Sequence, residues 1–154
     1  MRNWRIRLVT RLVHTAYFFV KGMTIGVRAA CFDAEGRIFL VRHSYIAGWH
    51  MPGGGVERRE TVFSALEKEL REEGNLVIEG KPELVHVYFN RRTSKRDHVV
   101  FFRCRVTQAS PRKPDLEIVE SGFFPLDQLP EATTSATRRR LAELAGEKEF
   151  DGLW

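Results

Sequence analysis

Short apolar runs separated by polar turn sequences mark the first part of the chain. The stretches "GMTIGVRAACFD" and "RIFLVRH" are rich in apolar and β-branched residues, a composition typical of strands. Between them, "DAEG" at Asp33–Gly36 is a turn sequence. We therefore predict a hairpin over residues 22–43, followed by an extended stretch, "IAGWHMP", that leads into three glycines.

Apolar residues then recur every four positions between residues 61 and 73. Val62, Leu66 and Leu70 have this spacing, which indicates a helix with one side in the core. The helix should end at Gly74–Asn75, because a residue with left-handed backbone commonly ends a helix.

Two further strands, a last strand and a closing helix are predicted after that point. "ELVHVYFN" (83–90) and "HVVFFRCRV" (98–106) read as strands joined by an exposed, mostly basic loop. "LEIVESGFFPL" (116–126) reads as the last strand, and "TSATRRRLAELA" (134–145) as the helix. This order predicts one layered domain of mixed α/β or α+β class, which suits 154 residues.

Residues 1–20, "MRNWRIRLVTRLVHTAYFFV", predict an additional basic amphipathic helix at the N-terminus. His14 and Thr15 interrupt its apolar run, so it lacks the clean apolar core of a signal peptide. The run is also shorter than the roughly 20 apolar residues that span a membrane. We expect its apolar side to pack on the domain. Contact with a membrane surface or a polyanion, or a targeting role, are the alternatives.

The formal net charge of +5 is concentrated at this N-terminal end, because all 20 acidic residues follow residue 30. Cys31 and Cys104 both lie in apolar, strand-like runs and lack the spacing of a zinc site. We interpret them as free, buried thiols in a reducing compartment. Together with the lack of an export signal, this leads us to expect a cytoplasmic location.

Three glutamates, Glu69, Glu72 and Glu73, share one arc at the end of the predicted helix, beside its buried side. Like charges repel there, and the helix dipole disfavours anions at a C-terminus. A cation such as Mg²⁺, Mn²⁺ or Ca²⁺ would relieve both effects, since these ions prefer oxygen ligands. The alternative is a solvated acidic turn that pairs with Lys68 and Arg71. The three glycines at 53–55 favour the cation, because such loops expose backbone groups to ions and phosphates.

The stretch from Gly54 to Leu76 resembles the box of the Nudix hydrolase family. In that box a glycine is followed by five residues and a glutamate, then by seven residues and Arg-Glu-apolar-x-Glu-Glu-x-Gly-apolar. Gly54 and Glu60 have this spacing, and "KELREEGNL" follows, with Lys68 at the arginine position and Gly74–Asn75 in place of x-Gly. "GWHMPGGGVE" and "FFPLDQLP" also look like family sequences, so the resemblance covers residues 22–145.

The resemblance implies an α/β/α sandwich around a mixed sheet and cleavage of a diphosphate linkage in a nucleotide or nucleoside-diphosphate derivative. It implies one domain over residues 21–147, with the helix at 1–20 before it and a tail at 148–154 after it. Mg²⁺ is the expected cofactor, with Mn²⁺ possible. The implied metal ligands are Glu69, Glu72, Glu73 and the carbonyl of Gly53. Within the box we choose Glu72 as the base; Glu117 or, our choice outside the box, Glu120 are the alternatives.

Other roles follow by position in the box. Lys68 would orient a glutamate, while Gly54 and Glu60 would be structural. Arg91 and Arg92 are expected to contact substrate from the basic loop, unless that loop is merely solvated. Trp49 would stack on a base, unless it belongs to the core.

The expected partner is a small-molecule nucleotide, with no stable nucleic-acid partner, and the expected assembly is a monomer or homodimer. Two other function classes stay open. One is a Nudix-fold module that binds nucleotide or RNA without turnover, and the other is a nucleic-acid or membrane-surface binder that uses the basic N-terminus.

Overall fold

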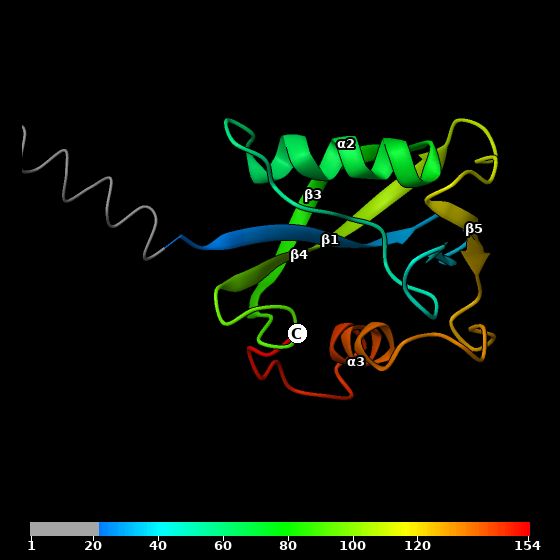
Figure 1. The fold of residues 1–154 in the computed structure, drawn as a ribbon. Coiled ribbons are helices and arrows are strands. Elements are labelled where there is room, and N and C mark those ends of the chain that lie inside the picture. The colour runs from blue at the N-terminus through cyan, green and yellow to red at the C-terminus, as the bar shows by residue number, and fades with distance from the viewer. Residues whose placement is uncertain (1–21) are drawn as a thin grey trace, which may run out of the picture.

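A five-stranded sheet with one helix on each face makes up the computed structural model, which describes residues 22–154 (Figure 1). Its strand order is β3-β4-β1-β2-β5. The strands are β1 Thr24–Phe32, β2 Ile38–His43, β3 Leu76–Phe89, β4 Asp97–Gln108 and β5 Ile118–Phe124. β1 and β4 run parallel and the other neighbours antiparallel, so the predicted mixed sheet and sandwich are confirmed. The helix predicted at residues 1–20 lies outside the described residues.

Helix α2, Val62–Gly74, is shifted by one residue at each end from the stretch 61–73 that the apolar periodicity predicted. It begins with a capping box, in which the Thr61 and Ser64 side chains each accept a hydrogen bond from the other's backbone N–H. It ends at Asn75, whose left-handed backbone (φ 52°) directs its N–H to the Arg71 carbonyl. Helix α2 is therefore capped at both ends.

The sheet buries two apolar clusters because side chains alternate between its faces along each strand. Val27, Ala29 and Cys31 of β1 pack with Leu66 and Leu70 of α2. Ala30, which lies between Ala29 and Cys31 along β1, points to the other face of the sheet. It packs there in the second cluster, which Leu141 of helix α3 (Ser135–Leu144) joins. Figure 1 shows α2 and α3 on these opposite faces.

Cys31 and Cys104 are paired in register across β1 and β4, and both thiols are free and buried. This confirms the predicted free thiols. No helix among residues 22–154 is long and apolar enough to cross a membrane.

Strand β3 begins at Leu76, directly after α2, rather than at residue 83 as the sequence pattern predicted. The polar stretch "EGKPE" interrupts the apolar pattern of this strand, so the pattern did not indicate its first half. The pairing register shifts at the same place, between Glu79 and Glu83. Gly80 has a positive φ of 74° at this irregularity. Pro82 is tolerated there because β3 is an edge strand of the sheet.

The segment predicted as a tail packs against the end of β3. The Phe89 N–H donates to the Gly152 carbonyl at 2.8 Å, and the Trp154 N–H donates to the Phe89 carbonyl at 3.2 Å. Leu153 forms a parallel bridge with Phe89. These contacts bring the chain back to the sheet after α3.

Candidate active site

The last turn of α2 carries a buried carboxylate, Glu73, which is only 5% exposed. Its Oε2 accepts a hydrogen bond of 2.7 Å from the backbone N–H of Gly53, in the glycine loop. Its Oε1 lies 3.5 Å from Nε2 of His43, at the end of β2. The side chain is thus fixed between a loop and a strand that lie 20 or more residues away in the sequence.

The glycine loop lies against β1 and is held there by backbone and side-chain hydrogen bonds. The Val27 N–H donates to the Gly54 carbonyl at 2.8 Å. The Arg28 guanidinium donates to the carbonyls of Met51 and Gly53. Gly53 itself has a φ of 141°, and a Cβ there would overlap the Val27 carbonyl oxygen, so only glycine fits this approach.

Glu69, one turn earlier on α2, lies against the same loop. A Cβ added at Gly54 would come within 2.5 Å of its carboxylate, so the missing side chain leaves the room that this carboxylate occupies. Burial raises the pKa of Glu69, and the neighbouring Lys68 opposes this rise.

Lys68, in the middle of α2, joins the helix to the loop before it. Its Nζ lies 2.9 Å from Glu60 Oε1 and 3.9 Å from Glu69 Oε1. Glu60 in turn accepts a 2.9 Å hydrogen bond from the Glu57 N–H. These contacts link α2 to the loop before it, and the structural role of Glu60 and the orienting role of Lys68 stay predictions.

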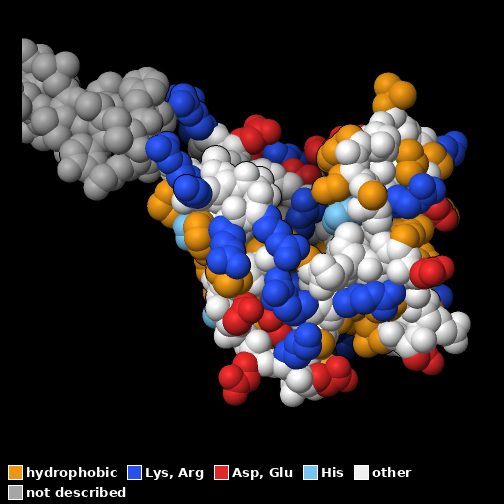
Figure 2. All heavy atoms as spheres, turned by 60° about the horizontal axis from the view of Figure 1, so that its bottom comes forward, with side chains coloured by type: hydrophobic (Ala, Val, Ile, Leu, Met, Phe, Trp, Pro, Cys, Tyr) orange, Lys and Arg blue, Asp and Glu red, His pale blue; other side chains and the backbone are white. Residues whose placement is uncertain are grey.

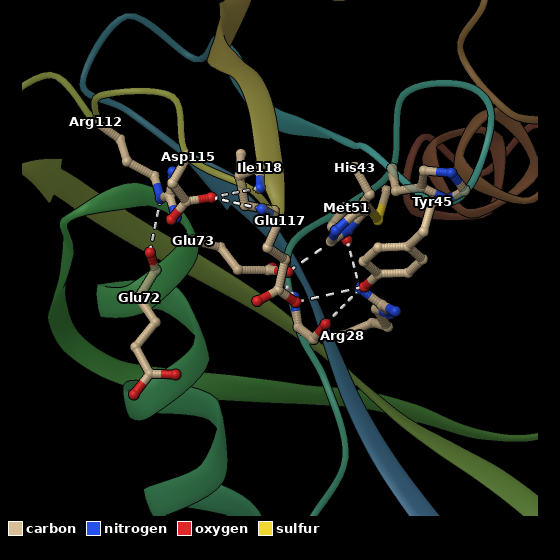
Figure 3. A network of polar contacts seen from close by, with 12 residues as sticks. Arg28, His43, Tyr45, Met51, Glu72, Glu73, Arg112, Asp115, Glu117 and Ile118 are labelled. Atoms are coloured by element: carbon tan, nitrogen blue, oxygen red, sulfur yellow. Dashed lines mark hydrogen bonds and ion pairs between the residues drawn. The ribbon is translucent and has the colours of Figure 1, made fainter.

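Glu117, just before β5, completes a cluster that the sequence had only partly indicated. The ligand atoms of His43, Glu73 and Glu117 all lie within 4.8 Å of one another. Figure 3 shows the Glu73 and Glu117 side chains directed toward each other. The Glu117 carbonyl accepts a 2.9 Å hydrogen bond from the Ser44 N–H, and the Tyr45 hydroxyl lies 3.4 Å from its carboxylate.

The structure does not bring Glu120, the other candidate outside the box, to this cluster. Its carboxylate pairs with Arg42 of β2 at 2.7 Å and is 54% exposed. The Arg42 guanidinium lies over the ring of Trp49, which belongs to the cluster on the α3 side. Three residues after Glu117, Glu120 belongs to a different surface because strand residues alternate between faces.

Glu72 is exposed, and its carboxylate points away from Glu73 (Figure 3). It lines a cavity of about 600 Å³, which we call the acidic hollow. The Arg112 side chain reaches this hollow and donates to the Glu72 carbonyl at 2.7 Å and to Asp115 at 2.6 Å. The lining carboxylates are Glu57, Glu60, Glu69, Glu72, Glu73, Asp115 and Glu117.

A second cavity, of about 800 Å³, lies on the other side of Glu69, Glu73 and Glu117, which line both. We call it the main cavity. Arg28 and Arg92 line it, whereas Arg91 lines neither cavity. Figure 2, in which the α3 side is turned forward, shows Lys and Arg side chains gathered on that side of the molecule.

Trp49 lies in the core rather than in the main cavity. It is 7% exposed and packs edge-on against Phe124, with ring centroids 4.9 Å apart. The aromatic residues that do line the main cavity are Tyr45, His50 and Trp154.

Burial and crowding shape the electrostatics of the cluster. Burial raises the pKa of Glu73 to about 7; Arg28 and the Gly53 N–H oppose the rise, and Glu69 and Glu117 add to it. Burial, then Arg28, lowers the pKa of His43 to about 4. His43 is therefore neutral at pH 7, and its contact with Glu73 is not an ion pair. A cation would stabilise the ionised carboxylates here.

Arg28 and His43 were missed as site residues at the sequence level. Arg28 had a signal, since it is a lone charge in the strand-like run "GVRAACF". His43 had none, because a histidine that ends an apolar strand is ordinary and only the fold brings it to Glu73.

A family model and a curated relative match this chain. The family model described as NUDIX domain matches residues 22–144. The MutT4 protein of Mycobacterium tuberculosis (strain CDC 1551 / Oshkosh) is 32% identical over 104 residues. The match covers 64% of this chain and 41% of that protein, so the chain spans less than half of the relative's length.

Two crystal structures have the same fold. A MutT Nudix hydrolase from Burkholderia pseudomallei is 27% identical with a TM-score of 0.65, covering 79% of this chain and 97% of that one. An ADP-ribose pyrophosphatase from Streptococcus suis is 30% identical with a TM-score of 0.62, covering 82% and 94%. Since the family model spans most of its length, this chain belongs to the Nudix hydrolase family.

Proposed function

We propose that this chain hydrolyses a diphosphate linkage in a nucleotide or nucleoside-diphosphate derivative, with Mg²⁺ as its cofactor. One observation carries the proposal: Glu69, Glu73 and Glu117 converge at the boundary between the acidic hollow and the main cavity. Carboxylates on a shared wall could hold a metal ion where it also meets a substrate's phosphates. The similarity to an ADP-ribose pyrophosphatase supports a nucleoside-diphosphate substrate class.

The residues present fit a divalent ion with oxygen ligands. Glu73 is buried, has a raised pKa and lies next to two other carboxylates, so a bound cation would stabilise its ionised form. Glu69 and Glu73 would hold the ion, and Glu117 faces them. The Gly53 carbonyl, which accepts a hydrogen bond from Arg28, would be a further ligand. The Glu72 carboxylate points away from Glu73 and would join the ligands only if its side chain turned (Figure 3). The His43 imidazole lies beside these oxygen ligands. When bound, the ion supplies a charge that neutralises phosphate oxygens and lowers the pKa of water.

Residues of the chain itself would do the remaining work. Arg28 lines the main cavity beside Glu73, so its guanidinium would attract the diphosphate. Glu117 would accept the proton from water, because its carboxylate faces Glu73, whereas that of Glu72 points away (Figure 3). Lys68 would keep Glu69 in position through its contact with that carboxylate.

The decisive variant is Glu73→Gln, because a neutral amide is a poor ligand for Mg²⁺. We expect turnover on a panel of diphosphate compounds with Mg²⁺ to fall by several orders of magnitude, with circular dichroism unchanged. Glu67→Gln, at an exposed position of the same helix, is the matched control and should keep wild-type turnover. EDTA should abolish the wild-type activity.

Near-wild-type turnover in Glu73→Gln would contradict this site. Nucleotide binding by the wild type without turnover of any compound would instead favour the binding module. The cytoplasmic location and the monomeric or homodimeric state remain predictions, which cell fractionation and light scattering can test.

A further inference from the structure

We propose that Trp154 is the base-stacking residue of the main cavity, so that this cavity takes a nucleoside diphosphate with its base against the indole. This inference rests on the proposed function and specifies the substrate class of the same site. Trp154 belongs to the segment 148–154, which the sequence predicted to be a tail. Three features carry it: how the indole is held, where it lies in the cavity, and which polar groups surround it.

The indole of Trp154 is held by backbone and ring contacts. The backbone N–H of Trp154 donates to the Phe89 carbonyl at 3.2 Å. The ring meets Tyr88 and Phe101 edge-on, with centroids 5.5 Å and 5.8 Å apart. Packing against two neighbouring aromatic rings restricts the orientation of the indole. The side chain is nonetheless only partly buried, and it lines the main cavity.

A fully buried arginine anchors the same segment. The Arg140 guanidinium lies 3.9 Å from the Tyr88 ring centroid and 5.3 Å from that of Trp154. It donates to the Leu153 carbonyl at 2.9 Å and pairs with Glu143, which also accepts a 2.6 Å hydrogen bond from the Tyr88 hydroxyl. A ring held this way loses little freedom when a ligand stacks on it, which favours binding.

Trp154 and the carboxylates line the main cavity from segments that different strands hold. Trp154 is attached to the end of β3, next to Asn90 and Arg92, whereas Glu117 is attached to the segment after β2. β4 and β1 lie between β3 and β2, so the strands that hold these two segments are about 14 Å apart at the usual strand spacing. Phosphates at the carboxylates would therefore leave the base near Trp154.

The other aromatic residues of the cavity are less suitable for a base. Tyr45 lies beside Glu117, and the His50 ring lies 5.8 Å from the ring of His43, so both lie near the carboxylates. Where β3 ends and β4 begins, Asp97 is already engaged by Thr24 at 2.7 Å and by Asn90 at 2.8 Å. Stacking rather than hydrogen bonding would then dominate, and several bases should be accepted.

The test compares two ligands that differ by a nucleoside. α,β-Methylene-ADP carries the base and resists cleavage, whereas methylenediphosphonate carries only the phosphate part. Both are titrated calorimetrically, with Mg²⁺, into the wild type and into Trp154→Phe and Trp154→Ala. We expect Trp154→Ala to weaken α,β-methylene-ADP by about 5- to 150-fold and to leave methylenediphosphonate unchanged. Trp154→Phe should keep most of the affinity.

Fluorescence gives a second readout that a purely structural role would not produce. α,β-Methylene-ADP should quench the tryptophan emission of the wild type, and Trp154→Phe should lose that quenching while remaining folded. Equal loss of both ligands in Trp154→Ala, or equal affinity of both ligands for the wild type, would overturn the proposal. Base-dependent binding without hydrolysis would support it and overturn only the proposed reaction.

Discussion

At the glycine loop, a single missing methyl group decides where the Glu69 carboxylate lies. In Gly54→Ala the new Cβ would come within 2.5 Å of that carboxylate, which must then move because it ends a flexible side chain. We expect the variant to fold normally and to lose about 100-fold in turnover, a typical effect of misplacing a site group by about 1 Å. Steady-state kinetics with Mg²⁺ and a thermal melt check this.

Gly55→Ala is the matched control for that variant, because a Cβ at Gly55 meets nothing within 4 Å. It should keep both wild-type turnover and wild-type melting temperature. An equal loss of activity in the two alanine variants would mean that loop flexibility, rather than the position of Glu69, limits the reaction.

Glu73 should make the metal-free protein less stable as the pH rises. Its pKa is about 7 in the folded state and near 4.5 when exposed, so the folded state binds more protons between these values. The free energy of unfolding should therefore fall by about 3 kcal/mol from about pH 4.5 to pH 7 through this group. Urea unfolding in EDTA, for the wild type and Glu73→Gln, measures it.

Because Glu73→Gln lacks the titrating group, its stability should change less with pH than that of the wild type. Parallel pH profiles for the two proteins would show that Glu73 ionises in the folded state near its ordinary pKa. Adding Mg²⁺ should stabilise the wild type more at high pH, since a metal ion needs the ionised carboxylate.

The loop between β3 and β4 contains two adjacent arginines, Arg91 and Arg92, in different environments. Arg92 lines the main cavity and Arg91 does not. Arg92→Ala should raise the KM for a nucleoside-diphosphate substrate about tenfold, since charge-assisted contacts contribute roughly 1.5 kcal/mol or more. Arg91→Ala should behave as wild type, and equal effects of the two would point to a diffuse electrostatic contribution of the whole loop.

The buried Arg140–Glu143 pair attaches α3 and the segment at 152–154 to the sheet, so its effect extends to the whole molecule. Glu143→Gln would leave the Arg140 charge buried without its partner. We expect the free energy of unfolding to fall by about 3 kcal/mol or more, measured by urea titration. Glu147→Gln, at an exposed position, is the control and should not change the free energy of unfolding. Equal stability of the two variants would contradict the prediction and would mean that water solvates the Arg140 charge in place of Glu143.

Local patterns were sufficient for much of the fold. The spacing of Val62, Leu66 and Leu70, together with the end signal at Gly74–Asn75, predicted α2 within a residue at each end. Helix periodicity is a property of neighbouring residues, so it can be read without the tertiary structure. The start of β3 could not be read this way, because "EGKPE" breaks the alternation where the register shifts.

The residues of the candidate site likewise fall into those that a local sequence pattern indicated and those that only the fold brings together. Glu69, Glu73 and the glycines lie within one stretch of sequence, so their spacing alone identified them as one chemical unit. Arg28, His43 and Glu117 come from three other segments, and nothing local distinguishes Glu117 from Glu120. Only strand pairing and side-chain alternation bring Glu117 to Glu73, leave Glu120 with Arg42, and set Trp154 in the main cavity. The sequence by itself thus determined the motif and its chemistry, whereas the tertiary structure decided which distant groups surround it, because long-range contacts depend on how strands pair.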